Sequence, residues 1–297
     1  MSWIQIELIT SANQCDMLEE LLFRCGASSV TFQDAENQPV YEPAPGSTPL
    51  WTGTKVKGLF TEDININTVI ATISSEAPQV QIKPLVKTIE DKQWEKECIR
   101  DFHAMQFGNR LWVCPGWCTP PDPDAINVML DPGCGFGTGS HATTALCLQW
   151  LDAHCIAGKY VIDYGCGSGI LGIAASLLGA RFVLGVDIDP QALEASQKNA
   201  QRNHVATEKF GTVYPENIPT GAKADILLAN ILSGPLTELA PSLTSLIKPG
   251  GDIVLSGILN DQTEAVIAAY QPWFAMDPPV LKEGWVRLTG KKHSATL

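Results

Sequence analysis

The sequence predicts an α/β protein: a Rossmann-like domain with a mostly parallel sheet, preceded by a small ferredoxin-like α+β domain. Two observations support this fold class. Between Tyr160 and Asp189 the chain contains a strand, a glycine-rich turn, a helix and a second strand, and strands and helices keep alternating afterwards. Residues 1–87 show the different order β-α-β-β-α-β, which is typical of ferredoxin-like domains.

Length, charge and cysteine content limit the classes of protein that fit. The 297 residues suffice for one large and one small domain. A net charge of −12 argues against a nucleic-acid partner and suits a basic substrate. Nine cysteines without a C-x-x-C pair indicate reduced thiols and a cytoplasmic location. We expect no membrane span, no secretory signal and no metal, and we interpret the close pair Cys114 and Cys118 as structural.

The first part of the chain is expected to form a separate small domain over residues 1–87. Its strands and helices are expected at residues 4–8, 13–25, 29–32, 55–61, 64–74 and 80–86, from the spacing of the apolar residues. No catalytic group of residues appears in it, so the domain is interpreted as a binding or positioning module, or as a structural appendage. Residues 88–130 are predicted to link it to the larger domain through a helix at 91–102 and a strand at 110–114.

A glycine-rich segment opens the larger domain, which is expected over residues 131–297. Four glycines stand at alternate positions in DPGCGFGTGSHATT, between Asp131 and Thr144. Ser140 is predicted to cap the helix that follows, and Thr144 in the first turn of that helix is a candidate contact for a ligand. Such a segment before the βαβ unit is expected to form a wall of the same pocket, with a flexible surface loop as the alternative.

The βαβ unit carries the strongest functional signal. Its first strand, Tyr160–Tyr164, leads into a glycine cluster that includes Gly165 and Gly167. Glycines permit a tight turn whose N–H groups, at the start of a helix, suit an anionic group. Asp187 follows the second strand, where a carboxylate binds the hydroxyls of a ribose. These residues therefore predict a nucleoside-bearing cofactor.

The glycine pattern alone leaves the identity of that cofactor open. Gly167, Gly169 and Gly172 also match the dinucleotide fingerprint G-x-G-x-x-G, so a nicotinamide enzyme fits as well as another nucleoside-binding protein. A glycine turn without any ligand is a further alternative. Asp189 precedes Pro190 and is predicted to cap a helix rather than to bind a ribose.

The remaining elements continue the α/β pattern. Helices are expected at residues 192–203, 236–247 and 262–270, strands at 210–213, 224–230, 252–256, 280–282 and 285–289, and a turn at 248–251. The strand Ala224–Asn230 ends in a polar residue at the edge where open parallel sheets bind their ligands. The last two strands are predicted to form a hairpin, which the usual dinucleotide-binding fold lacks.

Four stretches taken together resemble one family. DPGCGFGTGSHATT, VIDYGCGSGILGIAA, GVDIDP and LLANILSGPL are similar to motifs of the ribosomal protein L11 methyltransferase family, and the similarity covers essentially the whole chain. The glycine turn alone marks only the wider class of S-adenosylmethionine-dependent methyltransferases, whereas the first and last stretches are more specific. Ser140, Ala142 and the pair Cys134-Gly135 depart from the residues common in the family, without touching a proposed ligand contact.

The resemblance implies a class I methyltransferase fold with S-adenosylmethionine as cofactor. It also implies methylation of lysine side chains and of the N-terminal amine of a basic ribosomal protein, which residues 1–87 are expected to grip. The cofactor-binding positions of the family correspond to Thr144, Gly165, Asp187 and Asn230, and the glycine turn adds Gly167. Asn230 is expected to position the incoming amine.

Methyl transfer requires positioning and a neutral amine more than a dedicated base. His141 is a possible proton acceptor, although a capping role is the preferred interpretation, and no catalytic role is expected for Cys166. Two alternatives from other classes stay open at this point: a nicotinamide-dependent oxidoreductase and a non-catalytic binding protein.

Overall fold

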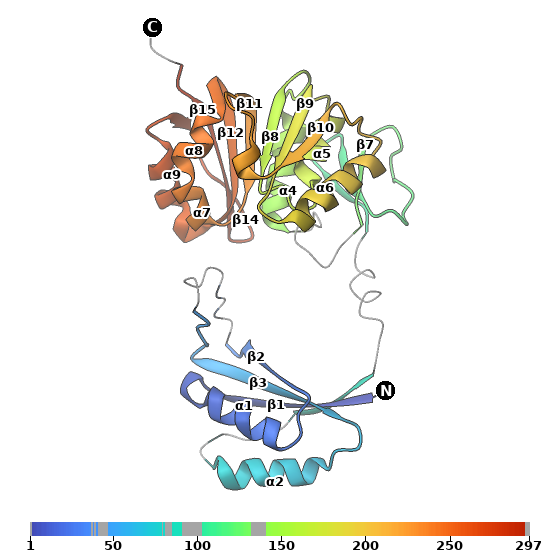
Figure 1. Ribbon diagram of the computed structural model, residues 1–297, viewed down its shortest axis with the longest axis vertical. Helices are drawn as coiled ribbons and strands as arrows, with labels where there is room; N and C mark the ends of the chain where they lie inside the picture. Colours follow the sequence, from blue (N-terminus) through green and yellow to red (C-terminus); the bar gives the residue numbers. More distant parts are fainter. Residues whose placement is uncertain are drawn as a thin grey trace. The chain divides into compact units, whose positions relative to one another are not determined.

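The computed structural model describes residues 2–36, 38, 40, 47–78, 80, 85–90, 103–131 and 141–294. The chain divides into two compact units, residues 1–97 and 98–297, whose elements are labelled in Figure 1. The linker helix expected at 91–102 and residues 132–140 of the glycine-rich segment lie outside the described residues.

The front unit is a four-stranded antiparallel sheet with two helices on one side (Figure 1). Its elements are β1 (Ser2–Ser11), η1 (Ala12–Gln14), α1 (Cys15–Arg24), β2 (Ser29–Asp34), β3 (Gly53–Thr61), α2 (Ile66–Glu76) and β4 (Leu85–Glu90). The strand order β2-β3-β1-β4 confirms the predicted ferredoxin-like arrangement. Ile6 and Leu8, at alternate positions of β1, pack against Leu18 and Leu22 of α1 in its apolar core.

The larger unit contains an eight-stranded sheet of order β10-β9-β8-β11-β12-β15-β13, with β14 paired to β15. The strands are β8 (Tyr160–Tyr164), β9 (Phe182–Val186), β10 (Phe210–Val213), β11 (Ala224–Asn230), β12 (Ile247–Leu259), β13 (Phe274–Met276), β14 (Val280–Lys282) and β15 (Trp285–Lys292). β8 to β12 run parallel, and β15 runs antiparallel to β12. The strand order reverses between β8 and β11, the position at which open α/β sheets bind their ligands. The mostly parallel sheet and the final hairpin are both confirmed.

Helices cover both faces of this sheet (Figure 1). One apolar core contains residues of α4 (Ala142–Ala153), α5 (Ile170–Leu177) and α6 (Pro190–Arg202), and the other contains residues of α7 (Ser233–Glu238), α8 (Ala240–Ser245) and α9 (Thr263–Tyr270). Val161 and Ile162, neighbours on β8, belong to opposite cores because side chains alternate across a strand. Two 3-10 turns, η2 (Pro215–Asn217) and η3 (Asn260–Gln262), complete the connections.

The structure corrects the predicted elements at three places. The single helix expected over 236–247 is two short helices that meet at Leu239, because Pro241 in the first turn of α8 lacks an N–H for a continuous helix. The strand expected at 252–256 is the longer β12, which also includes residues 248–251; these four have no partner on β11, because the pairing passes from Ile247–Ala224 to Asp252–Ile226. The short strand β13 was not predicted.

A second, smaller sheet belongs to the same unit. It consists of β5 (Met105–Phe107), β6 (Leu111–Cys114) and β7 (Ile126–Met129), of which only β6 was predicted. The buried carboxylate of Asp152 on α4 accepts hydrogen bonds from the main-chain N–H groups of Asn109 and Arg110. This contact attaches the β5–β6 turn to α4.

Candidate functional site

The glycine turn between β8 and α5 is held in a left-handed backbone conformation. The angle φ is +73° at Gly165, +52° at Gly167 and +81° at Gly169, values that residues with a Cβ rarely adopt. The N–H groups of Gly165 and Cys166 donate to Val186 O at 2.7 and 3.0 Å, which attaches the turn to the end of β9. Gly169 is the N-cap of α5, so the first N–H groups of that helix have no acceptor within it. The turn therefore directs helix N–H groups to the edge of the sheet, an arrangement that suits an anion.

Asp187 lies beside this turn. Its Oδ2 accepts a hydrogen bond from Gly167 N at 2.9 Å, and its Oδ1 accepts one from Asp189 N at 3.0 Å. Each carboxylate oxygen has room for a second hydrogen bond, so Asp187 still has capacity to accept from hydroxyl groups. The side chain of Asp189 accepts from Gln191 N at 2.8 Å and caps α6, with Pro190 in the first turn, as predicted.

Asn230 and Thr144 form a second pair at the same edge. Asn230 ends β11, the strand next to β8, and Thr144 lies in the first turn of α4 with only 3% of its surface exposed. Nδ2 of Asn230 donates a hydrogen bond to Oγ1 of Thr144 at 3.3 Å. The two residues stand 86 positions apart, so only the fold brings them together.

Ile231 connects the two groups. A Cβ on Gly165 would lie 2.3 Å from Cγ2 of Ile231, so the residue after Asn230 packs directly on the glycine turn. A Cβ on Gly257, where φ is +87°, would lie 2.1 Å from Ile231 O, so β12 holds the main chain of Ile231 from the other side. The predicted site residues lie together at the carboxyl ends of β8, β9 and β11 and the start of α4: Thr144, Gly165, Gly167, Asp187 and Asn230.

His141 caps α4, in place of Ser140, which lies outside the described residues. Its Nδ1 accepts a hydrogen bond from Thr143 N at 3.4 Å and lies 2.8 Å from Thr143 Oγ1. The ring packs edge-on against Trp285, with 4.9 Å between the ring centroids. Because Nδ1 is engaged by Thr143, the geometry favours the capping interpretation over proton transfer.

A buried carboxylate that the sequence analysis did not single out lies behind the turn. Asp163 is 1% exposed, and its Oδ2 accepts the N–H of Gly172 at 2.8 Å. Burial raises the pKa of Asp163 to about 7, and the negative charge of Asp187 adds to the rise. In the sequence, Asp163 could have been noticed as the one acid inside the otherwise apolar strand YVIDY. Burial also raises the pKa of Cys166 to about 12, which keeps the thiol protonated and unreactive.

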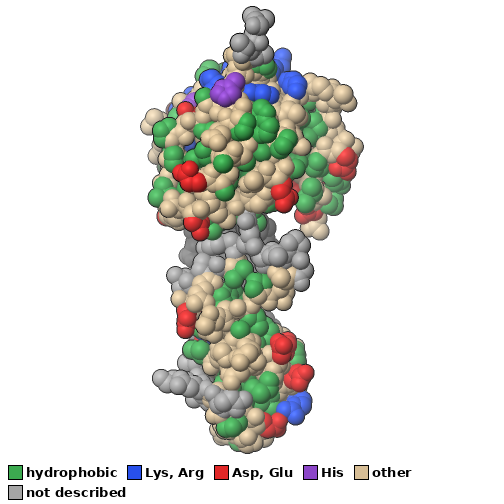
Figure 2. All heavy atoms as spheres, turned by 90° about the vertical axis from the view of Figure 1, so that its left-hand side faces the viewer, with side chains coloured by type: hydrophobic (Ala, Val, Ile, Leu, Met, Phe, Trp, Pro, Cys, Tyr) green, Lys and Arg blue, Asp and Glu red, His purple; other side chains and the backbone are tan. Residues whose placement is uncertain are grey.

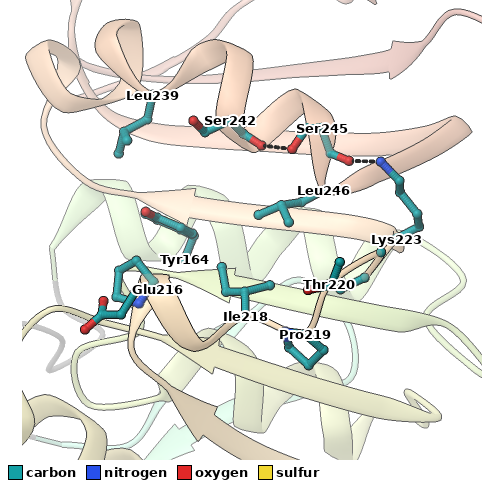
Figure 3. A pocket seen from close by; sticks show the side chains of 13 residues that line it. Tyr164, Glu216, Ile218, Pro219, Thr220, Lys223, Leu239, Ser242, Ser245 and Leu246 are labelled. Carbon is teal, nitrogen blue, oxygen red and sulfur yellow. Dashed lines mark hydrogen bonds between the residues drawn. The ribbon is translucent and has the colours of Figure 1, made fainter.

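A cavity of about 520 Å³ lies on the face of the sheet opposite α5 (Figure 3). Tyr164 at the end of β8, the connection from Pro215 to Lys223, and α8 with its flanking residues line it. The β10–β11 connection, which the structure describes throughout, contains η2 but no α-helix, so a loop covers this part of the sheet. Neither the glycines of the turn nor Asp187 line the cavity, which is therefore separate from the predicted nucleoside site.

Two features are absent from the part of the chain that the structure describes. No cluster of three or more His, Cys, Asp or Glu side chains in these ranges is placed to hold a metal ion. None of the helices described is long and apolar enough to cross a membrane.

The fold and the site define a class of enzyme. A seven-strand path in which five parallel strands are followed by an antiparallel β15 inserted beside β12 is the class I methyltransferase sheet, with a glycine turn after its first strand and an acid after its second. The three positive-φ glycines, the N-terminus of α5 and the carboxylate of Asp187 fit S-adenosylmethionine. The chain is an S-adenosylmethionine-dependent methyltransferase.

Comparisons with known proteins identify the family. The model of the family described as ribosomal protein L11 methyltransferase (PrmA) matches residues 2–293. Proteins named ribosomal protein L11 methyltransferase are 53% identical in Marinobacter nauticus, over 98% of this chain and 99% of that protein, and 50% identical in Actinobacillus pleuropneumoniae serotype 5b, over 98% and 100%. The crystal structure of a ribosomal protein L11 methylase from Lactobacillus delbrueckii subsp. bulgaricus shares 30% identity and a TM-score of 0.59, over 65% of this chain and 100% of that one. The chain belongs to the ribosomal protein L11 methyltransferase family, which confirms the resemblance and decides against a nicotinamide enzyme.

Proposed function

We propose that this enzyme methylates lysine side chains and the N-terminal α-amine of ribosomal protein L11. The observation that carries the proposal is the meeting of two groups at one sheet edge. The glycine turn with Asp187 offers contacts for a nucleoside cofactor, and the Asn230–Thr144 pair beside it offers a contact for an amine.

Roles for the cofactor contacts follow from the donors and acceptors present. The N–H groups at the start of α5 would bind the carboxylate of the methionine part, and Asp187 would accept hydrogen bonds from the ribose hydroxyls. Gly165 and Gly167 would allow close approach of the cofactor to the main chain, and Thr144 would bound the site from α4. S-adenosylmethionine supplies a methyl group that its sulfonium already activates.

Asn230 is suited to orient the amine. Its Nδ2 is committed to Thr144 Oγ1, which leaves Oδ1 as the side-chain atom able to accept an N–H from the substrate. An amide cannot take a proton, so Asn230 acts by position and not as a base. Deprotonating a lysine at pH 7 costs roughly 4–5 kcal/mol, and an α-amine roughly 1–1.5 kcal/mol. Desolvation of the amine at the site lowers this cost, which is why no dedicated base is required.

The predicted front domain, residues 1–87 within the front unit, is proposed to grip the protein substrate. It has its own apolar core, and no catalytic cluster was recognised in its sequence. The net charge of −12 favours a small basic protein over nucleic acid. On the face drawn in Figure 2, acidic side chains are spread over both units, whereas the basic ones of the larger unit gather near one end. A cytoplasmic location is part of this proposal, because the substrate is made there.

Mass spectrometry tests the proposal directly. Purified L11 is incubated with the enzyme and labelled S-adenosylmethionine, and mass gains of methyl groups on lysines and the N-terminus are expected. A variant lacking residues 1–87 should still bind the cofactor by calorimetry but should no longer methylate L11. Unmodified L11 in the presence of a cofactor-binding enzyme would contradict the substrate, and full activity of the truncated variant would contradict the role of the front unit.

A further inference from the structure

Three polar side chains lie along one side of α6 and its C-cap residue, Asn203. Ser196, Asn199 and Asn203 follow one another at helical spacing, i, i+3 and i+7, so they point to the same side of the helix. Ser196 is fully buried and Asn203 is 7% exposed. Buried polar groups destabilise a protein unless they are hydrogen-bonded, so the partners of these three side chains indicate what each one contributes.

The first two side chains hold the glycine turn. Oγ of Ser196 donates to Gly167 O at 2.9 Å, and Nδ2 of Asn199 donates to Ser168 O at 2.9 Å. A Cβ on Gly169 would lie 3.1 Å from Cα of Ser196, so helix and turn are in close main-chain contact. Two consecutive carbonyls of the turn are thus anchored to one helix.

Anchoring a carbonyl also fixes the N–H group of the next residue. The peptide unit is planar and trans, so the carbonyl of Gly167 and the N–H of Ser168 point in opposite directions within one rigid plane. The hydrogen bond from Ser196 therefore directs that N–H away from α6, and Asn199 does the same for the next peptide. The second peptide is held from both ends, because its N–H, on Gly169, donates to Cys166 O at 2.8 Å.

The third side chain makes no contact with the turn. Asn203 Oδ1 accepts from Met129 N at 2.6 Å, and its Nδ2 donates to Met129 O at 2.8 Å. Nearby, the ion pair of Arg202 with Asp131, at 2.5 Å, joins the same end of α6 to the segment after β7. Asn199 and Asn203 are both asparagines and stand one helical turn apart, but Asn199 bonds the glycine turn and Asn203 bonds Met129. Asn203 can therefore serve as a control for Asn199.

We propose that Ser196 and Asn199 are positioning residues for the cofactor, because they fix the peptide planes of the turn that receives its methionine part. Asn203 stabilises the attachment of β7 to α6 and has no such role. This inference rests on the proposed placement of the cofactor at the glycine turn.

The test compares three variants of the full-length enzyme: Asn199→Ala, Ser196→Ala and Asn203→Ala. For each one, calorimetry gives the Kd for S-adenosylmethionine, thermal unfolding gives Tm, and turnover is measured at saturating cofactor. We expect the Kd to rise about tenfold in the first two variants, the effect of one lost hydrogen bond, with turnover at saturation retained. Asn203→Ala should lower Tm and leave the Kd within a factor of about two.

Asn199→Asp serves as a second variant that keeps the size of the side chain and replaces the amide donor with a negatively charged acceptor. It should weaken cofactor binding at least as much as Asn199→Ala, because a carboxylate would face Ser168 O. Unchanged Kd values in the Asn199 variants, or an equal rise in Asn203→Ala, would overturn the inference. Failure of the unmodified enzyme to bind S-adenosylmethionine would instead refute the proposed function itself.

Discussion

The side-chain amide of Asn230 donates to the hydroxyl of Thr144 at 3.3 Å and joins the carboxyl end of β11 to the first turn of α4. The contact has a chemical consequence, because it distinguishes the two ends of the amide. With Nδ2 directed at Thr144, the carbonyl oxygen Oδ1 is the end that remains for a substrate amine. Thr144 is thus as important for the orientation of Asn230 as Asn230 is for the amine.

Removing the Thr144 hydroxyl should impair turnover without emptying the cofactor site. Thr144→Val keeps the volume of the buried side chain but leaves Nδ2 of Asn230 without this acceptor, so the amide is free to rotate. We expect a severalfold fall in kcat, whereas Asn230→Ala should lower kcat by on the order of tenfold or more. Cofactor affinity, measured by calorimetry, should change less than kcat in both variants.

A double-mutant cycle then tests whether the two side chains act as a unit. If they do, Thr144→Val should add little to the loss already caused by Asn230→Ala. Independent, additive losses, or a loss of affinity as large as the loss of turnover, would contradict the positioning role.

Asp187 and Asp189 provide a matched pair of acids two positions apart. Asp187→Ala should reduce affinity for S-adenosylmethionine at least tenfold to a hundredfold, because hydrogen bonds to a charged acceptor contribute about 1.5–3 kcal/mol each. Asp189→Ala should leave affinity nearly unchanged and cost about 1 kcal/mol of stability, the effect of a lost helix cap. Calorimetry and denaturant unfolding on both variants distinguish the two roles, and near-normal affinity in Asp187→Ala would remove it from the cofactor site.

The parts of the site that the sequence predicted are those with a local signal. The turn at Gly165, the acid at Asp187 and the cap at Asp189 all lie within one βαβ unit, where glycine, strand and cap preferences depend on neighbouring residues. The roles of Ser196 and Asn199 could not be predicted, because polar residues on a helix are normally exposed. Only the packing of α6 on the turn shows that their partners are main-chain carbonyls.

Errors in the predicted fold also have physical causes. Apolar spacing continues across Pro241, so the pattern indicated one helix where the missing N–H of proline divides it into α7 and α8. The run Lys248–Gly251 has the composition of a turn and has no partner on β11, although it lies inside β12; the regular pairing with β11 resumes at Asp252.

Gly165 and Gly158 separate the cost of backbone conformation from the cost of contact. Their φ angles are +73° and +74°, but a Cβ on Gly158 would meet nothing within 4 Å, whereas one on Gly165 would lie 2.3 Å from Ile231 Cγ2. Gly158→Ala should therefore cost about 1–2 kcal/mol of unfolding free energy from strain alone. Gly165→Ala should cost a further 1–3 kcal/mol or so from overpacking, because Gly257 leaves the Ile231 main chain no room to shift. Denaturant unfolding measures the loss of unfolding free energy in both variants. Equal losses would show that Ile231 moves aside at no energetic cost.

Asp163 should make the stability of the protein depend on pH in a direction unusual for an acid. Burial raises the pKa of Asp163 from 3.8 to about 7 in the folded state. Between these values the folded protein holds a proton that the unfolded chain has released, so the stabilising protonated form is lost as pH rises through about 7. One pKa unit corresponds to about 1.4 kcal/mol, so raising the pH from about 5 to about 8.5 should cost roughly 3 kcal/mol through this group.

Asp163→Asn removes the titration and keeps an oxygen that can accept the N–H of Gly172. The difference in unfolding free energy between the variant and the unmodified protein should therefore shift in favour of the variant as pH rises, with most of the change between pH 3.8 and about 7. Urea unfolding followed by circular dichroism at several pH values measures this difference, and other titrating groups cancel because both proteins share them. Parallel stability curves for the two proteins would mean that the folded protein does not raise the pKa of Asp163.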